Sequence, residues 1–123
     1  MITDAVQLLI SPFVSSFSPI IESDELPAGV FAIHQEDIRN TLRDKDGIYG
    51  YEYNVQITVI GDSQDDIDPV TGLIIDLFEP LSGTYSETII EEVNTSRSQG
   101  VTWDNEKKKY YDQITFSIAT KNK

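Results

Sequence analysis

The sequence predicts an α+β fold, in which a mainly antiparallel β-sheet is covered by two helices in a single domain spanning residues 1–123. Two stretches, residues 49–59 and 110–118, alternate between apolar and polar side chains, which is typical of strands with one buried face. Between them, residues 67–81 carry apolar side chains at helical spacing. The resulting order of helix, strands, helix and strands is that of an α+β domain.

The N-terminal third begins with a short helix near Thr3. Pro12 should end or kink this helix, because proline lacks the amide hydrogen that a helix interior needs. Residues 18–29 contain two prolines and three acidic residues, and they indicate an extended connection. Val30–Gln35 is a strand candidate, and residues 36–44 either extend it or pair with it after a bend.

The centre of the chain predicts a hairpin followed by the second helix. Lys45–Gly47 is an Asp-Gly turn between strand-like residues, which is a strong hairpin signal. In the strand that follows, the apolar parity from Tyr49 to Val59 should face the helix Ile67–Leu81. The polar parity from Glu52 to Thr58 should then face solvent, a lumen or a neighbouring subunit.

The second helix and the C-terminal strands complete the prediction. Asp62 or Ser63 should cap the helix, Pro69 is placed in its first turn, and Pro80 should close it. The remaining segments are a loop at 82–86, a strand at 88–95, a turn-rich link at 96–103, a hairpin tip at 105–107 and a final strand at 109–120.

Composition excludes several classes of site. The net charge is −12, from 9 basic and 21 acidic residues, which works against specific nucleic-acid binding. The negative charge keeps the protein soluble, forms a surface that binds a basic partner, or lines a channel and repels the DNA that passes through it. The absence of cysteine excludes disulfides and zinc–thiolate sites. No apolar run is long enough for a membrane span, and the start lacks a basic signal region, so we expect an intracellular protein without a membrane partner.

No motif indicates catalysis, a metal site or a cofactor. His34 is the only histidine, and a strand position at a sheet edge or interface explains it better than a catalytic triad does. Asp44 and Asp46 resemble part of a calcium loop, but the positions that should supply the other carboxylates hold Leu42 and Tyr53. Glu36–Asp37 is a poor acid/base pair, because adjacent strand residues point to opposite faces. We therefore expect a protein that is not an enzyme.

Four ordered segments carry a family resemblance: Leu26–His34, the strand Tyr49–Ile60, the acid-started helix Asp65–Leu81 and the final segment Trp103–Phe116. An N-terminal helix precedes them, and the resemblance as a whole spans nearly the entire chain. In their succession they resemble the small tail-completion or tail-terminator-like proteins of long-tailed bacteriophages, a group that includes tail-to-head joining proteins. The resemblance rests on the order of elements rather than on an invariant motif.

This resemblance implies a non-enzymatic structural protein of a phage or prophage. Members form rings, commonly hexameric, that cap the growing tail tube and present a surface to the head connector. The implied partners are further copies of the chain, the tail tube protein and the head-completion or connector protein. The implied location is the head-proximal end of the virion tail, after assembly in the cytoplasm of the bacterial host.

Candidate contact residues follow from the exposed turns, the polar strand face and the basic run at 107–109. This run belongs either to a solvated hairpin tip or to a contact with an acidic patch on another subunit. The alternative function is an acidic binding module, an inhibitor or DNA mimic that occupies a basic site. The residues expected to contact a subunit or partner are Asp44, Asp46, Glu52, Asn54, Gln56, Trp103, Lys107, Lys108 and Lys109.

Overall fold

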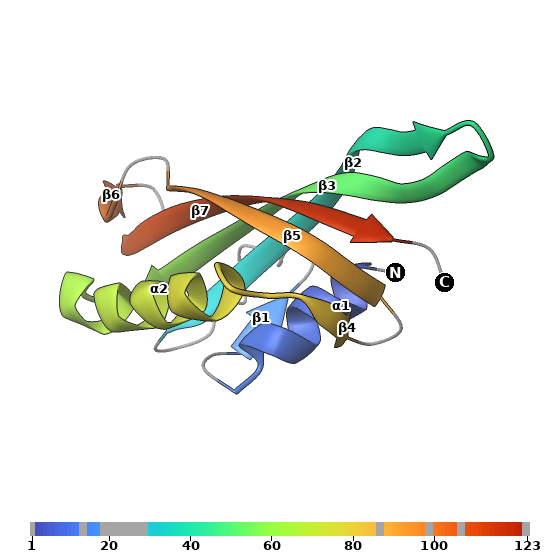
Figure 1. Cartoon of the computed structure of the whole chain (residues 1–123). Coiled ribbons are helices and arrows are strands. Elements are labelled where there is room, and N and C mark those ends of the chain that lie inside the picture. The colour runs from blue at the N-terminus through green and yellow to red at the C-terminus, as the bar shows by residue number, and fades with distance from the viewer. Residues whose placement is uncertain are drawn as a thin grey trace.

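A seven-stranded sheet with two helices packed on one of its faces forms the structure, which is a computed structural model (Figure 1). It describes residues 2–12, 15–17, 30–85, 88–97, 100–105 and 108–121. The predicted α+β fold with a mainly antiparallel sheet and two helices is confirmed. In chain order the elements are α1 (Ile2–Ile10), β1 (Ser15–Phe17), β2 (Phe31–Asp44), β3 (Gly47–Gly61), α2 (Gln64–Phe78), β4 (Gly83–Tyr85), β5 (Thr88–Arg97), β6 (Thr102–Asp104) and β7 (Lys109–Lys121).

The long hairpin of β2 and β3 is the centre of the sheet. Its turn lies where the Asp-Gly pair predicts it, with Asp44 opposite Gly47. Gly47 has a φ of 118°, a conformation that glycine adopts without steric cost. The segment after Val30 continues as one strand rather than bending into two. Two irregularities interrupt the pairing of β2 with β3: the first has Arg39 as an extra residue of β2, and the second has Tyr49 as an extra residue of β3.

The sheet order is β1-β2-β3-β7-β5-β4, and β6 pairs with the start of β7. Strand β7 runs antiparallel to β3 from Gly61 opposite Tyr110 to Gly50 opposite Lys121. Strand β1 is parallel to β2. The predicted loop at 82–86 contains strand β4, and the end of the predicted link at 96–103 belongs to β6, so these predictions were wrong there. Strand β1 was not predicted either, because three residues are too few to show a periodicity. The predicted connection at 18–29, and residues 106–107 of the predicted hairpin tip, lie outside the described residues.

Both helices begin and end close to the predicted positions. Ser63 is the N-cap of α2, and its hydroxyl accepts a hydrogen bond from the backbone N–H of Asp66 at 3.3 Å. Pro69 is the sixth residue of α2, whereas the sequence predicts it in the first turn. Helix α1 ends at Ile10, immediately before the turn at Pro12. Within the described ranges, neither helix is long and apolar enough to cross a membrane.

The hydrophobic core lies between the helices and one face of the sheet. From β3 it takes Val55, Ile57 and Val59, which confirms the predicted buried parity for this part of the strand. The ring of Phe78 on α2 stacks on that of Phe116 on β7, with 4.8 Å between the ring centroids. Each fully buried side chain of this size contributes about 1.5–3 kcal/mol of transfer free energy. Because the helices and the core cover one face of the sheet, the opposite face has no helical layer over it.

His34 belongs to the interior and not to a sheet edge or interface, so this prediction was wrong. It lies on β2 opposite Ile57, on the helix side of the sheet, and its side chain is fully buried. Its Nδ1 lies 2.5 Å from Oε1 of Glu36, whose side chain is two residues further on the same face and also buried. The pairing follows from the period of two in a strand. Asp37 points the other way and is exposed, as the strand geometry predicts.

Candidate functional site

The predicted contact residues fall into three groups along the molecule. The hairpin tip and strand β6 lie at opposite ends of the sheet (Figure 1). The fifteen residues of β3 connect these ends over about 45 Å, at 3.3 Å per residue. Lys107 lies outside the described residues. The groups are Asp44 and Asp46 at the tip, Glu52, Asn54 and Gln56 along β3, and Trp103, Lys108 and Lys109 at the end that carries β6.

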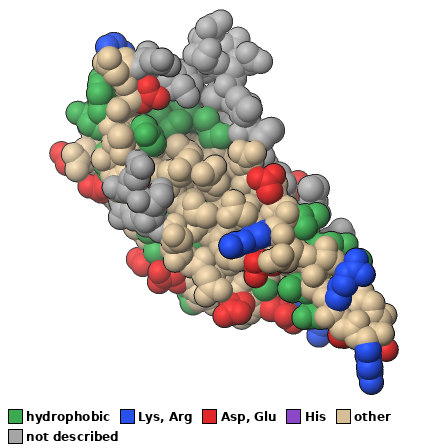
Figure 2. All heavy atoms as spheres, turned by 90° about the horizontal axis from the view of Figure 1, so that it is seen from above, with side chains coloured by type: hydrophobic (Ala, Val, Ile, Leu, Met, Phe, Trp, Pro, Cys, Tyr) green, Lys and Arg blue, Asp and Glu red, His purple; other side chains and the backbone are tan. Residues whose placement is uncertain are grey.

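The face of the sheet opposite the helices, here called the open face, is poor in charge at its centre. The strand register aligns polar residues in rows across it, of which only Asp37 is charged in the two central rows, and Figure 2 shows this face as mainly neither hydrophobic nor charged. Because 24% of the whole chain is charged, this composition is unusual. Depletion of charge is a property of the centres of protein interfaces. The two central rows are Gln35–Gln56–Thr115–Ser96 and Asp37–Asn54–Ser117–Asn94.

Glu52, at the edge of this neutral area, is held within the chain. Its Oε1 accepts a hydrogen bond from Nδ2 of Asn40 at 3.1 Å and lies 3.8 Å from Nε of Arg39. Asn40 pairs directly with Glu52 across β2 and β3. Such an exposed ion pair contributes only about 0–1 kcal/mol to stability. Its effect is to neutralise a carboxylate beside the open face.

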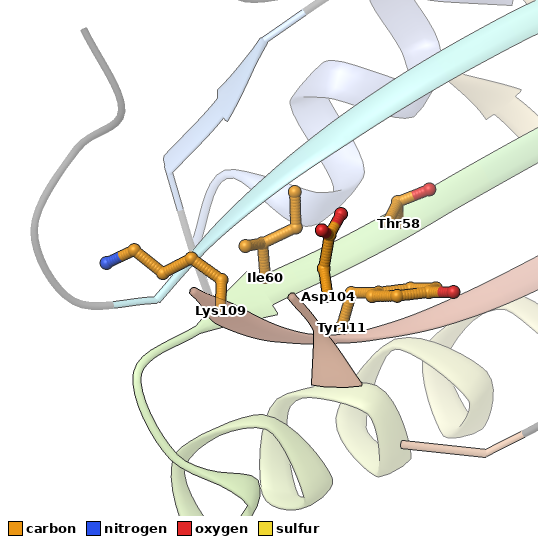
Figure 3. Close-up of a pocket in the computed structure, with 5 residues that line it drawn as sticks. All are labelled: Thr58, Ile60, Asp104, Lys109 and Tyr111. Atoms are coloured by element: carbon orange, nitrogen blue, oxygen red, sulfur yellow. The ribbon is translucent and has the colours of Figure 1, made fainter. Parts of the chain in front are cut away.

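A pocket of about 160 Å³ hollows the open face at the end that carries β6 (Figure 3). Thr58 and Ile60 of β3 and Tyr111 of β7 form its floor and wall, and Asp104 and Lys109 stand at its side. The Nζ of Lys109 forms an ion pair with the carboxylate of Asp62 just outside the pocket. Lys109 is one of the predicted contact residues, and the ion pair with Asp62 holds its side chain in place.

Sequence reasoning missed most of the pocket, although Lys109 is among the predicted contact residues. Thr58, Ile60, Asp104 and Tyr111 come from three strands, and they meet because Asp104 pairs with Lys109 while Ile60 pairs with Tyr111. No local signal in the sequence encodes these registers. The alternation of β3 does indicate that Thr58 lies on the polar face.

Trp103 and Lys108 lie near the pocket but have different surroundings. Trp103 pairs with Tyr110, which packs against the core, so its ring lies toward the helix side of the sheet. The two rings meet edge to face with centroids 4.7 Å apart, and 45% of Trp103 is exposed. The Nζ of Lys108 donates to Oδ1 of Asn105 at 3.0 Å. The tryptophan therefore does not line the pocket.

The distal part of the β2–β3 hairpin, residues 38–53, projects past the helices and is here called the arm (Figure 1). Large apolar side chains are exposed on it: Ile38 by 56%, Ile48 by 43% and Tyr49 by 38%. The sequence predicts that Tyr49 faces the second helix. That prediction was wrong for Tyr49, because β3 is longer than the helical layer beneath it. The arm therefore carries an apolar surface that the core does not use.

Tyr53, at the base of the arm, provides a test of this packing. Burial, followed by repulsion from Tyr51, raises the pKa of the Tyr53 phenol above its ordinary value. The folded state therefore holds this proton more tightly than the unfolded state. The associated stability is fully present below the unfolded pKa, about 10, and is lost as pH rises through the higher folded pKa. We expect Tyr53→Phe to retain more of its neutral-pH stability in alkali than the unmodified chain.

Urea unfolding at a series of pH values measures this difference. Tyr49→Phe, an exposed position of the same strand, is the matched control and should follow the unmodified chain. Equal alkaline losses in Tyr53→Phe and the unmodified chain would contradict the assignment.

Comparison with known proteins shows a similar fold in a solved structure. No family model matches the chain, and no curated protein matches it. Among solved structures, the fold is similar to that of a chain in the "Virion of native gene transfer agent (GTA) particle", with a TM-score of 0.69. The two sequences are 16% identical, and the alignment covers 95% of this chain and 84% of the other. At this identity the likeness shows a shared fold.

Proposed function

We propose that this protein is a non-enzymatic structural component of a phage or prophage tail. In this proposal it assembles as a homo-oligomeric ring, with six copies as the expected number, that completes the tail tube. The ring joins the tube to the head-completion or connector protein at the head-proximal end of the virion tail. The observation that carries the proposal is the shared fold over 95% of the chain with a chain of a phage-like virion particle.

Two features of the molecule support a role in assembly. The open face is poor in charge at its centre, as the centres of interfaces are, and the arm exposes apolar side chains beyond the core. His34 is fully buried, so a substrate could not reach its imidazole in this conformation. The part of the chain that the structure describes brings together no group of three or more acidic, histidine or cysteine residues able to hold a metal ion.

The acidic binding module is the competing function, and one observation favours it. The exposed side of α2 carries only acidic charges, which suits a basic partner. These residues are Asp65, Asp66, Asp68, Asp76 and Glu79. A module of this kind would act as a monomer or dimer and would have no affinity for a tail tube.

Binding to tail tubes tests the proposal. The protein is mixed with tubes assembled from the tail tube protein encoded in the same phage or prophage genome and imaged by negative-stain electron microscopy. We expect density at one end of each tube. Deletion of the gene should leave heads and tails unjoined, and expression in trans should restore joined particles. Bare tube ends, or normal joined particles after deletion, would reject the function.

A further inference from the structure

We propose that copies of this chain bind one another head to tail, with the arm of one copy lying on the open face of the next. The helix side of the arm, with Ile38 and Tyr51, and the neighbouring exposed Tyr49 cover the pocket formed by Thr58, Ile60 and Tyr111. This contact rests on the proposed ring and specifies how neighbouring subunits would meet.

The donor surface is the helix side of the arm. Ile38 pairs with Tyr53, which packs against the core, so both lie on the helix side of the sheet. Tyr51 follows on the same parity of β3, and Tyr49 is the extra residue of β3 at the irregularity where the pairing passes from Gly50 to Ile48. The helices end before the arm does (Figure 1), and Ile38 and Tyr49 are 56% and 38% exposed, so the arm carries an apolar surface that the core does not use. Aromatic side chains of this kind are common anchors of protein interfaces.

The acceptor surface matches the donor surface in size and chemistry. The pocket of about 160 Å³ has room for one aromatic ring, because a cavity of about 150 Å³ in another protein binds benzene. Its lining combines the apolar Ile60 with the polar groups of Thr58 and Asp104, which suits the ring and the hydroxyl of a tyrosine. The polar rows of the open face extend from the pocket along β3 and β7, where the rest of the arm would lie.

The positions of the two surfaces favour a head-to-tail contact. They lie at opposite ends of the sheet and on opposite faces, so the arm cannot reach the pocket of its own chain. A copy that overhangs the next one brings the helix side of its arm onto the open face beneath it. Such a contact is heterologous, and it closes into a ring when the rotation between copies permits.

Charge favours this contact over a contact between helices. The tip carries both signs, with Arg43 and Lys45 beside Asp44 and Asp46, and the pocket end also carries both signs, with Lys108 beside Asp104. Pairs of opposite charge can therefore form between the two ends. The outer side of α2 carries only acidic charges and would repel a second α2.

A complementation experiment tests the arrangement. Tyr49→Asp damages the donor surface, and Thr58→Arg fills the acceptor pocket. Each variant alone should self-associate at least about tenfold more weakly than the unmodified chain in sedimentation velocity. An equimolar mixture should form a one-to-one dimer, because each variant keeps the half that the other lacks. Leu73→Asp on exposed α2 and Thr84→Arg on exposed β4 are the matched controls and should associate normally.

Cross-linking provides a second readout that does not depend on affinity. The chain has no cysteine, so a pair introduced in separate copies reports a single contact. Tyr49→Cys mixed with Thr58→Cys should give a disulfide-linked dimer under mild oxidation. Tyr49→Cys mixed with Asp76→Cys, on the exposed side of α2, should give at most a trace.

The outcomes separate this contact from the proposed function. Variants that associate like the unmodified chain, an unmodified chain that stays monomeric, or equal cross-linking of the Thr58 and Asp76 positions would overturn the head-to-tail contact. None of these results bears on whether the protein occupies tail tube ends, which electron microscopy of the tubes decides. Bare tube ends together with normal complementation would reject the function and leave the contact in place.

Discussion

Replacing Gly50 with alanine is expected to destabilise the protein by about 3 kcal/mol, because a Cβ there would overlap the backbone of the neighbouring strand. An ideal Cβ on Gly50 would lie 1.9 Å from the carbonyl oxygen of Thr120 and 2.9 Å from its carbonyl carbon. Neither atom belongs to a flexible side chain, so β3 and β7 would have to separate. The hydrogen bond from the Thr120 hydroxyl to the carbonyl of Tyr51, at 3.1 Å, would be strained with them.

Chemical denaturation of Gly50→Ala against the unmodified chain measures this effect. The matched control is Gly72→Ala on α2, where a Cβ meets no atom within 4 Å. That change should stabilise the protein by about 0.5–1 kcal/mol, because alanine has the higher helix propensity. A Gly50→Ala variant as stable as the unmodified chain would show that β3 and β7 are further apart than the structure has them.

Replacing Phe116 with alanine is expected to cost about 3–5 kcal/mol, which is the usual loss for a fully buried phenylalanine. Phe116 is 0% exposed and stacks on Phe78, so the change removes the ring stack that joins α2 to β7. Part of the loss comes from the cavity that the missing ring leaves in the core. The free energy of unfolding from thermal or urea denaturation measures the effect.

Two control variants make this result specific. Phe116→Leu keeps most of the volume and should lose about half as much stability or less. Tyr49→Ala removes an aromatic ring that lies outside the core and should change the stability of the monomer by no more than about 0.5 kcal/mol. Similar losses in Phe116→Ala and Tyr49→Ala would contradict the assignment of the core to the helix side of the sheet.

Several elements of the fold could be predicted because their signals are local. The alternation of β3 and β7, the Asp-Gly turn and the cap at Ser63 each depend on residues that are neighbours in the sequence. The burial of His34 with Glu36 could not be predicted in this way. A single polar residue in a strand shows neither how far the helical layer extends nor which partner lies two residues along the same face.

The candidate site could be predicted only in part. The alternation of β3 assigns Asn54 and Gln56 to its polar parity, and both lie on the open face, as expected. Their expected role in subunit contacts remains a prediction, as do the roles of the tip residues and of the basic run at 107–109. The pocket beside Lys109 was missed, because the strands that supply Thr58 and Tyr111 are far apart in the sequence.

The sequence by itself determined the class of fold, the long two-faced strand and the acid-started helix. Periodicity and capping are properties of short stretches of chain, so no tertiary information is needed to find them. Only the tertiary structure decided where the helical layer ends, which strands are neighbours and in what register. These depend on contacts between distant residues. They turn the end of β3 into a projecting arm and create a pocket at the opposite end of the same strand.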